Sequence, residues 1–366
     1  MQRLSRIGLR AAVACAVVAG ACVLAVPAAS AATPKLLVHG RRISSIDANS
    51  RLLVWRAYSA PTTLGGSCAS VIRRRSWASS AAAVLFRCDP RHEDDSYGDM
   101  ALGASTVAFS RVYIEGQGCC DTEFRTTLRT TGKAGLGSSF HHFGCGGNDI
   151  QGLAAHGNTA VYGRLHWVST NCPGNPSTGT ETLTGGGVST LAMAGGTTQP
   201  LTGTPPAALL GVSATRLVLV PYDLTNPPVN ELPGSLPEIQ VWNLGTRSRE
   251  RTIPETTGNV RALAVRGDEI AVMVDDAGSV RIDRFSASTG AAEESTPIAS
   301  TAKPMLTLYY GWAVYVAGKT VTALDTQTGN AHVVARPTYA PTQLAAVRGE
   351  AVWLAHGDRI LAAPLP

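Results

Sequence analysis

The sequence predicts an all-β protein built from a repeated unit of four antiparallel strands, and three observations support this. Nearly the same phrase occurs twice, as ALAVRGDEIAVMV from Ala262 and as LAAVRGEAVWLA from Leu344. Both copies contain β-branched apolar runs in which polar and apolar residues alternate, which is typical of half-buried strands. Gly, Asp and Asn recur between such runs, and these residues favour tight turns.

Five further segments repeat the same order of a strand, a tight turn and a β-branched strand. The second strands of all copies are centred at spacings of 38 to 57 residues, near Val54, Val107, Val161, Val218, Val272, Val314 and Val352. A four-stranded propeller blade needs about 40–45 residues, so the longer spacings indicate the same blade with longer loops. The sequence therefore predicts a single β-propeller, with seven blades as the first expectation. Six or eight blades stay possible, because the strand pattern is weakest between Gly185 and Gly196.

The cleanest unit predicts its four strands in order. Strand A covers Arg261 to Val265, strand B covers Glu269 to Val274, strand C covers Val280 to Phe285, and strand D follows Gly290. The next unit repeats this order as TLYYG, WAVYVAG, KTVTALD and TQTGNAHVVA.

This second unit carries a resemblance to a known family. The stretch VYVAGKTVTALDTQTG resembles a repeat of the pyrroloquinoline-quinone-type propellers, whose pattern A-x-D-x-x-T-G is matched by Ala323, Asp325, Thr328 and Gly329. IQVWNLGTRSRERTI, from Ile239, resembles instead the strand C-to-D part of a WD repeat. The resemblance covers mainly the last third of the chain and implies the fold rather than quinone binding, because the motif is a strand-turn signature. We expect no cofactor.

The end of the chain predicts how the ring closes. The last unit has only three predicted strands before Pro366, and KLLVH, from Lys35 to His39, can supply the fourth. This pairing would remove two exposed sheet edges.

Residues 1–31 are typical of a secretory signal peptide, with Arg3, Arg6 and Arg10 before an apolar core and the small-x-small site Ala29-Ser30-Ala31 after it. We therefore expect an exported, monomeric propeller over residues 32–366 without a transmembrane segment. Lipidation of Cys22 stays open as an alternative. Cleavage lowers the Lys and Arg count from 31 to 28, against 26 Asp and Glu, so no nucleic-acid partner is expected.

The cysteines of the mature chain predict disulfides, because six is an even number in an exported protein. A hairpin centred on Ala78 would place Cys68 opposite Cys88, so we expect these two to be bonded. The remaining four would pair between Cys119 or Cys120 and Cys145 or Cys172, in an order that the sequence leaves open. Thiols bonded in this way hold no metal, and we expect no metal site.

The long connections are predicted to lie on one face of the propeller, over the first four repeats. Successive strands reverse direction, so the B–C and D–A connections share a face, whereas the A–B turns on the other face are uniformly short. Such an asymmetry predicts a binding surface for an unknown protein or glycan. The candidate ligand-binding residues in these connections are His92, Asp94, Asp95, His141, His142, Asp149 and Asp223.

Two functions are compatible with this pattern. The first hypothesis is a non-catalytic binding or scaffold module that uses the long loops. The alternative is a carbohydrate-active propeller enzyme, a hydrolase or lyase, with its site at the channel mouth on the same face. The sequence contains no recognised catalytic signature, so no catalytic residue is assigned.

Overall fold

The computed structural model describes residues 31–40, 42–58, 70–87, 96–118, 121–130, 133–142, 146–171, 180–195, 198–254, 258–299 and 303–366. Strands and turns account for the regular structure of these ranges, which confirms the all-β prediction. Within the same ranges, no helix is long and apolar enough to cross a membrane.

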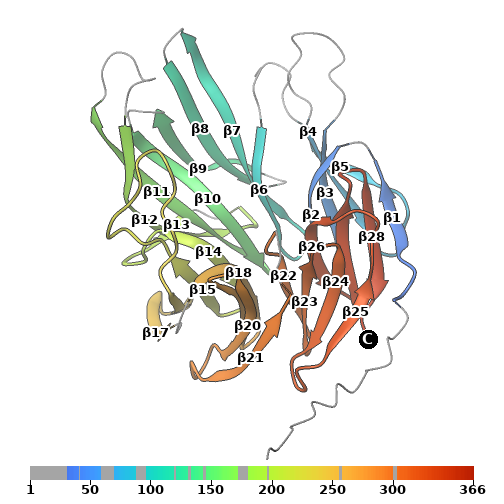
Figure 1. The fold of residues 1–366 in the computed structure, drawn as a ribbon. Coiled ribbons are helices and arrows are strands. Elements are labelled where there is room, and N and C mark those ends of the chain that lie inside the picture. Colours follow the sequence, from blue (N-terminus) through green and yellow to red (C-terminus); the bar gives the residue numbers. More distant parts are fainter. Residues whose placement is uncertain are drawn as a thin grey trace, which may run out of the picture.

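The described strands form six antiparallel sheets, which are arranged as the blades of a propeller (Figure 1). The first sheet contains β2 (Ile43–Ala48), β3 (Leu52–Tyr58), β4 (Ser70–Ser76) and β5 (Ala83–Arg87). An eight-stranded sheet contains β6 (Ser96–Leu102), β7 (Val107–Gly118), β8 (Asp121–Thr130), β9 (Lys133–His142), β10 (Gly146–His156), β11 (Thr159–Asn171), β12 (Thr180–Ala192) and β13 (Thr198–Leu201).

Three more sheets follow in chain order. The first of them contains β14 (Ala207–Val212), β15 (Arg216–Pro221), β16 (Glu238–Asn243) and β17 (Ser248–Pro254). The next contains β18 (Asn259–Arg266), β19 (Glu269–Asp276), β20 (Ser279–Ser286) and β21 (Ala292–Ile298). The third contains β22 (Leu306–Tyr309), β23 (Trp312–Ala317), β24 (Thr320–Asp325) and β25 (Ala331–Ala335).

The closing sheet joins the two ends of the described chain. Its order is β1 (Lys35–His39), β28 (Arg359–Pro364), β27 (Glu350–Ala355) and β26 (Pro341–Val347). The predicted closure by the N-terminal strand is thus confirmed. Leu37 of β1 is 7% exposed and belongs to a core cluster with Leu53 and Trp55 of β3, so the closing sheet packs against the first sheet.

The number of blades is six, one of the two alternatives to seven that the sequence left open. The eight-stranded sheet contains two of the predicted four-strand units, β6–β9 and β10–β13. They merge because β9 and β10 pair at two positions, His141 with Gly147 and His142 with Gly146. This pairing depends on the length of β9. The alternation of polar and apolar residues within one repeat does not predict that length.

The weak strand signal around Gly185 to Gly196 conceals one of the longest strands. β12 has 13 residues and pairs with β11 along most of its length. Gly186 has φ +145°, and a Cβ there would lie 2.0 Å from the carbonyl oxygen of Arg164. The glycine therefore permits a close approach between two backbones, which is a recognised role of glycine within strands.

The predicted register of the β4–β5 hairpin is wrong. Bonding of Cys68 to Cys88 assumed that the numbers of paired residues add to 156. Val71 pairs with Arg87 and Arg74 with Ala83, which gives 158 and 157, with a bulge between Ile72 and Arg73. A bulge changes the register within one hairpin, so the geometric reason for this disulfide fails, and both cysteines lie outside the described residues.

Candidate binding face

One face of the propeller carries short turns, and the opposite face carries the long connections and the ends of the longest strands. On the short-turn face, only Gly267 and Asp268 separate β18 from β19, and only Arg348 and Gly349 separate β26 from β27. On the opposite face, hereafter the loop face, residues 222–237 connect β15 to β16. Towards the same face β7, β8, β11 and β12 extend over 12, 10, 13 and 13 residues, and their ends project at the top of Figure 1.

Part of what the sequence predicted as loop is strand. His141 and His142 end β9, where they pair with Phe124 and Glu123 of β8. Asp149 lies in β10, opposite Leu165 of β11. The hairpins grow longer than in the C-terminal sheets because their antiparallel partners continue to supply backbone hydrogen bonds beyond the ring.

Two of the candidate residues, Asp149 and Asp223, lie at the junction of β10 and the 222–237 connection. Tyr222 is 6% exposed, and its hydroxyl donates to Gln151 Oε1 at 3.2 Å, two residues after Asp149. Burial raises the pKa of Tyr222, and the nearby charge of Asp99 raises it further, so the hydroxyl stays protonated and able to donate. His92, Asp94, Asp95 and all six cysteines of the mature chain lie outside the described residues.

The carboxylates with described contacts hold the backbone of this junction. Asp223 Oδ1 accepts hydrogen bonds from the hydroxyl and the backbone N–H of Thr225, which lower the pKa of Asp223. Asp99 of β6 accepts a hydrogen bond from the backbone N–H of Gly152 at 2.7 Å. Asp99 on β6 therefore fixes the bulge of β10 at Gly152, and Asp223 fixes the first turn of the connection.

The 222–237 connection is anchored at its base and at its middle. At the base, the N–H of Asp223 donates to the carbonyl of Gly234 at 2.7 Å. At the middle, Asn230 exchanges two hydrogen bonds with Glu181 of β12: its own N–H donates to Glu181 O at 2.8 Å, and its Oδ1 accepts from Glu181 N at 2.9 Å. Glu181 is 3% exposed and also accepts from Gly146 N. Nothing in the sequence around Glu181 signals this role.

Exposed apolar side chains accompany the anchored connection. Val229 and Leu232, on either side of Asn230, are 52% and 44% exposed, and Val168 of β11 is 41% exposed. Val168 pairs with Thr182, the residue after Glu181. Exposed apolar groups on a fixed backbone are a feature of interaction surfaces.

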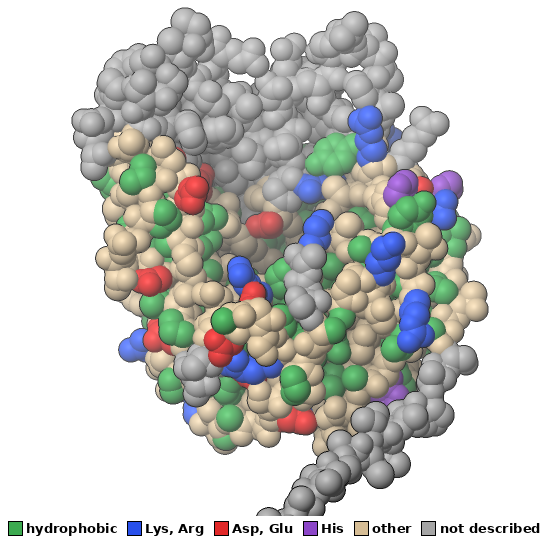
Figure 2. Space-filling model, viewed as in Figure 1, with side chains coloured by type: hydrophobic (Ala, Val, Ile, Leu, Met, Phe, Trp, Pro, Cys, Tyr) green, Lys and Arg blue, Asp and Glu red, His purple; other side chains and the backbone are tan. Residues whose placement is uncertain are grey.

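Charge is distributed unevenly over the molecule. Figure 2 shows Asp and Glu side chains mainly on the left and along the bottom, with several Lys and Arg side chains among them, and mostly Lys, Arg and His side chains on the right. No group of three or more His, Cys, Asp or Glu side chains that could hold a metal ion occurs among the described residues.

Among the comparisons with known proteins, one solved structure supports the fold. No family model matches the chain, and no curated protein matches its sequence. A chain of the crystal structure of a mitotic checkpoint complex superposes with a TM-score of 0.55 at 10% identity, covering 91% of this chain and 96% of that chain. An uncharacterized protein of Listeria monocytogenes gives a TM-score of 0.49 at 6% identity, covering 90% and 98% of the two chains. The designed protein Ika8 gives 0.48 at 15% identity, with the same shares of the two chains.

At these identities the likeness concerns the fold alone. The resemblance to propeller repeats is therefore supported for architecture, and the quinone-type assignment of the repeats finds no family match. The chain is similar in fold to other β-propellers, and this likeness by itself assigns no function.

Proposed function

We propose that the protein is an exported, disulfide-stapled binding module whose loop face docks a partner protein. The observation that carries this proposal is the anchored 222–237 connection with Val229 and Leu232 exposed on it. Two hydrogen bonds to Glu181 hold the connection in place, so little ordering entropy is lost when a partner covers these side chains.

Export and disulfides follow from the N-terminus and the cysteine content. N-terminal sequencing of the secreted protein should begin at Ala32. Peptide mapping without reduction should show the six cysteines in three intramolecular disulfide bonds. Free thiols would contradict the proposed disulfides.

The docking surface is tested by a matched pair of variants. Extracellular proteins and glycans are screened with the oxidised wild-type protein, and each specific binder is titrated against the variants. Replacement of both apolar residues, Val229→Ser with Leu232→Ser, should weaken a binder of the loop face by about tenfold or more. Val84→Ser, on β5 and 38% exposed, is the control and should change affinity less than about twofold.

Full affinity of the double variant would contradict the assignment of this face. If the binder is a glycan, the assignment of the binding face holds and the assignment of a protein partner is wrong. Circular dichroism of each variant verifies that the fold is retained.

A further inference from the structure

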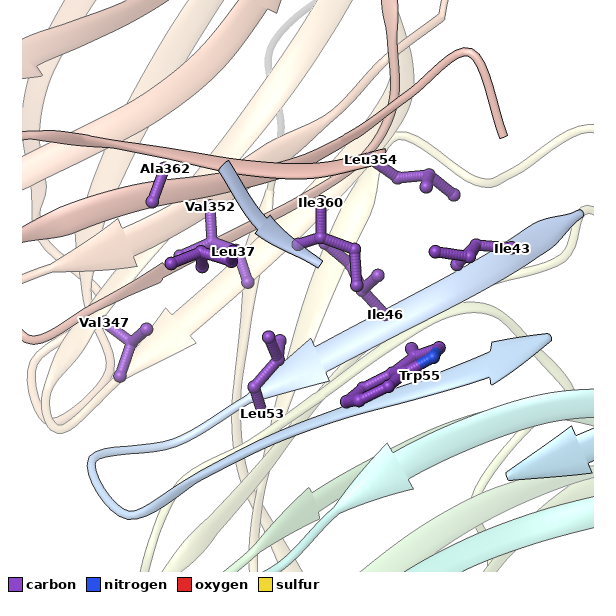
Figure 3. Packing of buried hydrophobic residues seen from close by; sticks show 11 residues of the cluster. Leu37, Ile43, Ile46, Leu53, Trp55, Val347, Val352, Leu354, Ile360 and Ala362 are labelled. Atoms are coloured by element: carbon purple, nitrogen blue, oxygen red, sulfur yellow. The ribbon is translucent and has the colours of Figure 1, made fainter. Parts of the chain in front are cut away.

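A cavity of 510 Å³ lies between the closing sheet and the first sheet, and no residue of the 222–237 connection lines it. β1 forms one wall with Leu37, Val38 and His39, and β3 and β4 form the other. Figure 3 shows the buried cluster that joins the two sheets here, in which Leu37 of β1 lies beside Val352 of β27, and Leu53 and Trp55 of β3 belong to the facing sheet. Because both walls are strands over a packed core, the cavity keeps its shape without a ligand.

Two arginines of β4 face this cavity. Arg73 pairs across the strands with Trp55 and Arg75 with Leu53, so both share the face that points to β1. Arg74, between them, points to the opposite face and is exposed. Because side chains alternate between the two faces of β4, two of the three consecutive arginines line the cavity and the third does not.

The two cavity arginines lack an anionic partner within the described part of the chain. Arg75 donates through Nη1 to the carbonyl oxygen of Leu37, at the bulge of β1, while its Nε is buried with no hydrogen-bond partner. Arg73 has no hydrogen bond or ion pair among the described residues. A half-buried guanidinium without an anion is unfavourable, because burial removes water without supplying a counter-charge.

Among the described residues, the rest of the lining adds polar and aromatic groups but no carboxylate. The described residues that line the cavity besides Arg73 and Arg75 are Leu37, Val38, His39, Gly40, Trp55, Ala57, Tyr58, Val71, Ser80 and Ala82. Asp358 contacts His39 at 3.8 Å but is not part of the lining, and it is shared with His356 and Arg359. Within the part of the chain that the structure describes, the cavity therefore combines two arginines that lack a carboxylate partner with an apolar and aromatic wall.

We propose that this cavity is a binding site for a small organic anion with an apolar body. The carboxylate or phosphate of the ligand is held by Arg73 and Arg75, and its apolar part lies against Trp55 and Ala57, which share their face of the sheet. Guanidinium groups bind such oxyanions through paired hydrogen bonds. The volume falls within the range of about 300–1,000 Å³ that is typical of small-molecule sites.

Isothermal titration of the mature, oxidised protein with benzoate, phenyl phosphate and uncharged benzamide tests the proposal. We expect saturable binding of at least one of the two anions at millimolar concentration or below, and binding of benzamide weaker by about tenfold or more. Which anion binds more tightly distinguishes a carboxylate ligand from a phosphate ligand.

The arginine variants locate the site. Arg73→Gln and Arg75→Gln should each weaken the anion by about tenfold, whereas Arg74→Gln is the matched control and should change affinity less than about twofold. Arg73→Gln is decisive, since Arg73 has no described partner whose loss would unfold the protein, and thermal melting verifies this. Absence of saturable anion binding, equal binding of benzamide, or an equal loss in Arg74→Gln would each overturn the proposal.

Discussion

Two sites on the sheets contain arginines whose surroundings differ: one is a groove beside β20, and the other is the cavity between β1 and β4. In the groove between β17 and the β20–β21 hairpin, Arg284 is 9% exposed and contacts Glu269, Glu293 and Glu294 at 3.3, 2.8 and 3.1 Å. In the groove between β1 and β4, Arg75 contacts only a carbonyl oxygen, and Arg73 has no partner among the described residues. Among the described residues, carboxylates of the chain itself neutralise the arginine at the first site but not the arginines at the second.

This difference shows that an arginine can join neighbouring sheets through ion pairs in one place and can bind a ligand in another. Arg284 also donates to the carbonyl of Thr326 in the next sheet, so its charge network joins consecutive sheets. Burial raises the pKa of Glu269, the attraction of Arg284 opposes that rise, and the charge of Glu293 adds to it. A buried arginine amid three carboxylates cannot be removed without leaving those charges uncompensated.

The largest effect should follow from opening the second groove by deletion of Lys35–His39. The closing sheet then loses its outer strand and the buried side chain of Leu37, and we expect a loss of about 4 kcal/mol in the free energy of unfolding. Chemical denaturation of the mature protein measures it. Leu36→Ser is the control, since Leu36 is 55% exposed on the same strand and should cost less than about 0.5 kcal/mol. A truncated protein as stable as the full one would show that β1 contributes nothing to closure.

Arg284→Gln and Arg73→Gln compare the two grooves directly. The first should lower the free energy of unfolding by about 3 kcal/mol, because Glu269, Glu293 and Glu294 lose their counter-charge. The second should change it by less than about 0.5 kcal/mol. Urea unfolding of both variants under one condition gives the difference, and equal effects would remove the distinction between the grooves.

A third junction contains a carboxylate without an arginine and should respond to pH. Asp47 of β2 accepts from the N–H of Leu102 of β6 at 2.6 Å and from Ala48 N at 2.7 Å. Burial raises the pKa of Asp47 from 3.8 to about 6, against the effect of these two hydrogen bonds. The folded protein thus binds the proton more tightly than the unfolded chain. The resulting stabilisation is fully present below pH 3.8 and is lost as the pH rises through about 6.

Between those limits the wild-type protein should lose about 2 kcal/mol of stability relative to Asp47→Asn, since one pKa unit corresponds to about 1.4 kcal/mol and the residue is only partly buried. Unfolding curves of both proteins across this range measure the difference in slope. Parallel pH profiles would mean that Asp47 does not titrate in this range.

The smallest effect concerns a glycine beside the Arg284 network. A Cβ at Gly329 would lie 2.3 Å from Glu294 Oε1, whereas a Cβ at Gly267 would meet nothing within 4 Å. Both glycines have positive φ, +69° and +59°, so both alanine variants incur the same backbone strain. Gly329→Ala should cost about 1 kcal/mol more than Gly267→Ala in thermal unfolding, because Glu294 must move away from Arg284. An equal cost would show that Glu294 yields freely.

The sequence by itself determined the strands of the clear C-terminal repeats and the closure of the ring. Strand A of the clearest repeat was predicted at Arg261 to Val265 and lies at Asn259–Arg266, and the closing strand was predicted and found at Lys35 to His39. These features depend on the period-two pattern and on glycine turns, which are local properties of a few consecutive residues. The face that carries the long connections was also predictable, because successive strands reverse direction and every second connection therefore lies on the same face.

The tertiary structure alone decided which side chains meet across sheets. Arg75 contacts Leu37, Arg284 contacts Thr326, and Asp47 contacts Leu102, and the members of these pairs lie 38, 42 and 55 residues apart in the sequence. The merging of two units through β9 and β10 and the register of β4 and β5 depend on strand length and on a bulge. Alternation tells which face of a strand a residue takes, but it does not tell what the neighbouring sheet presents to that face. The cavity with its two arginines exists only because the ring brings the beginning and the end of the chain together.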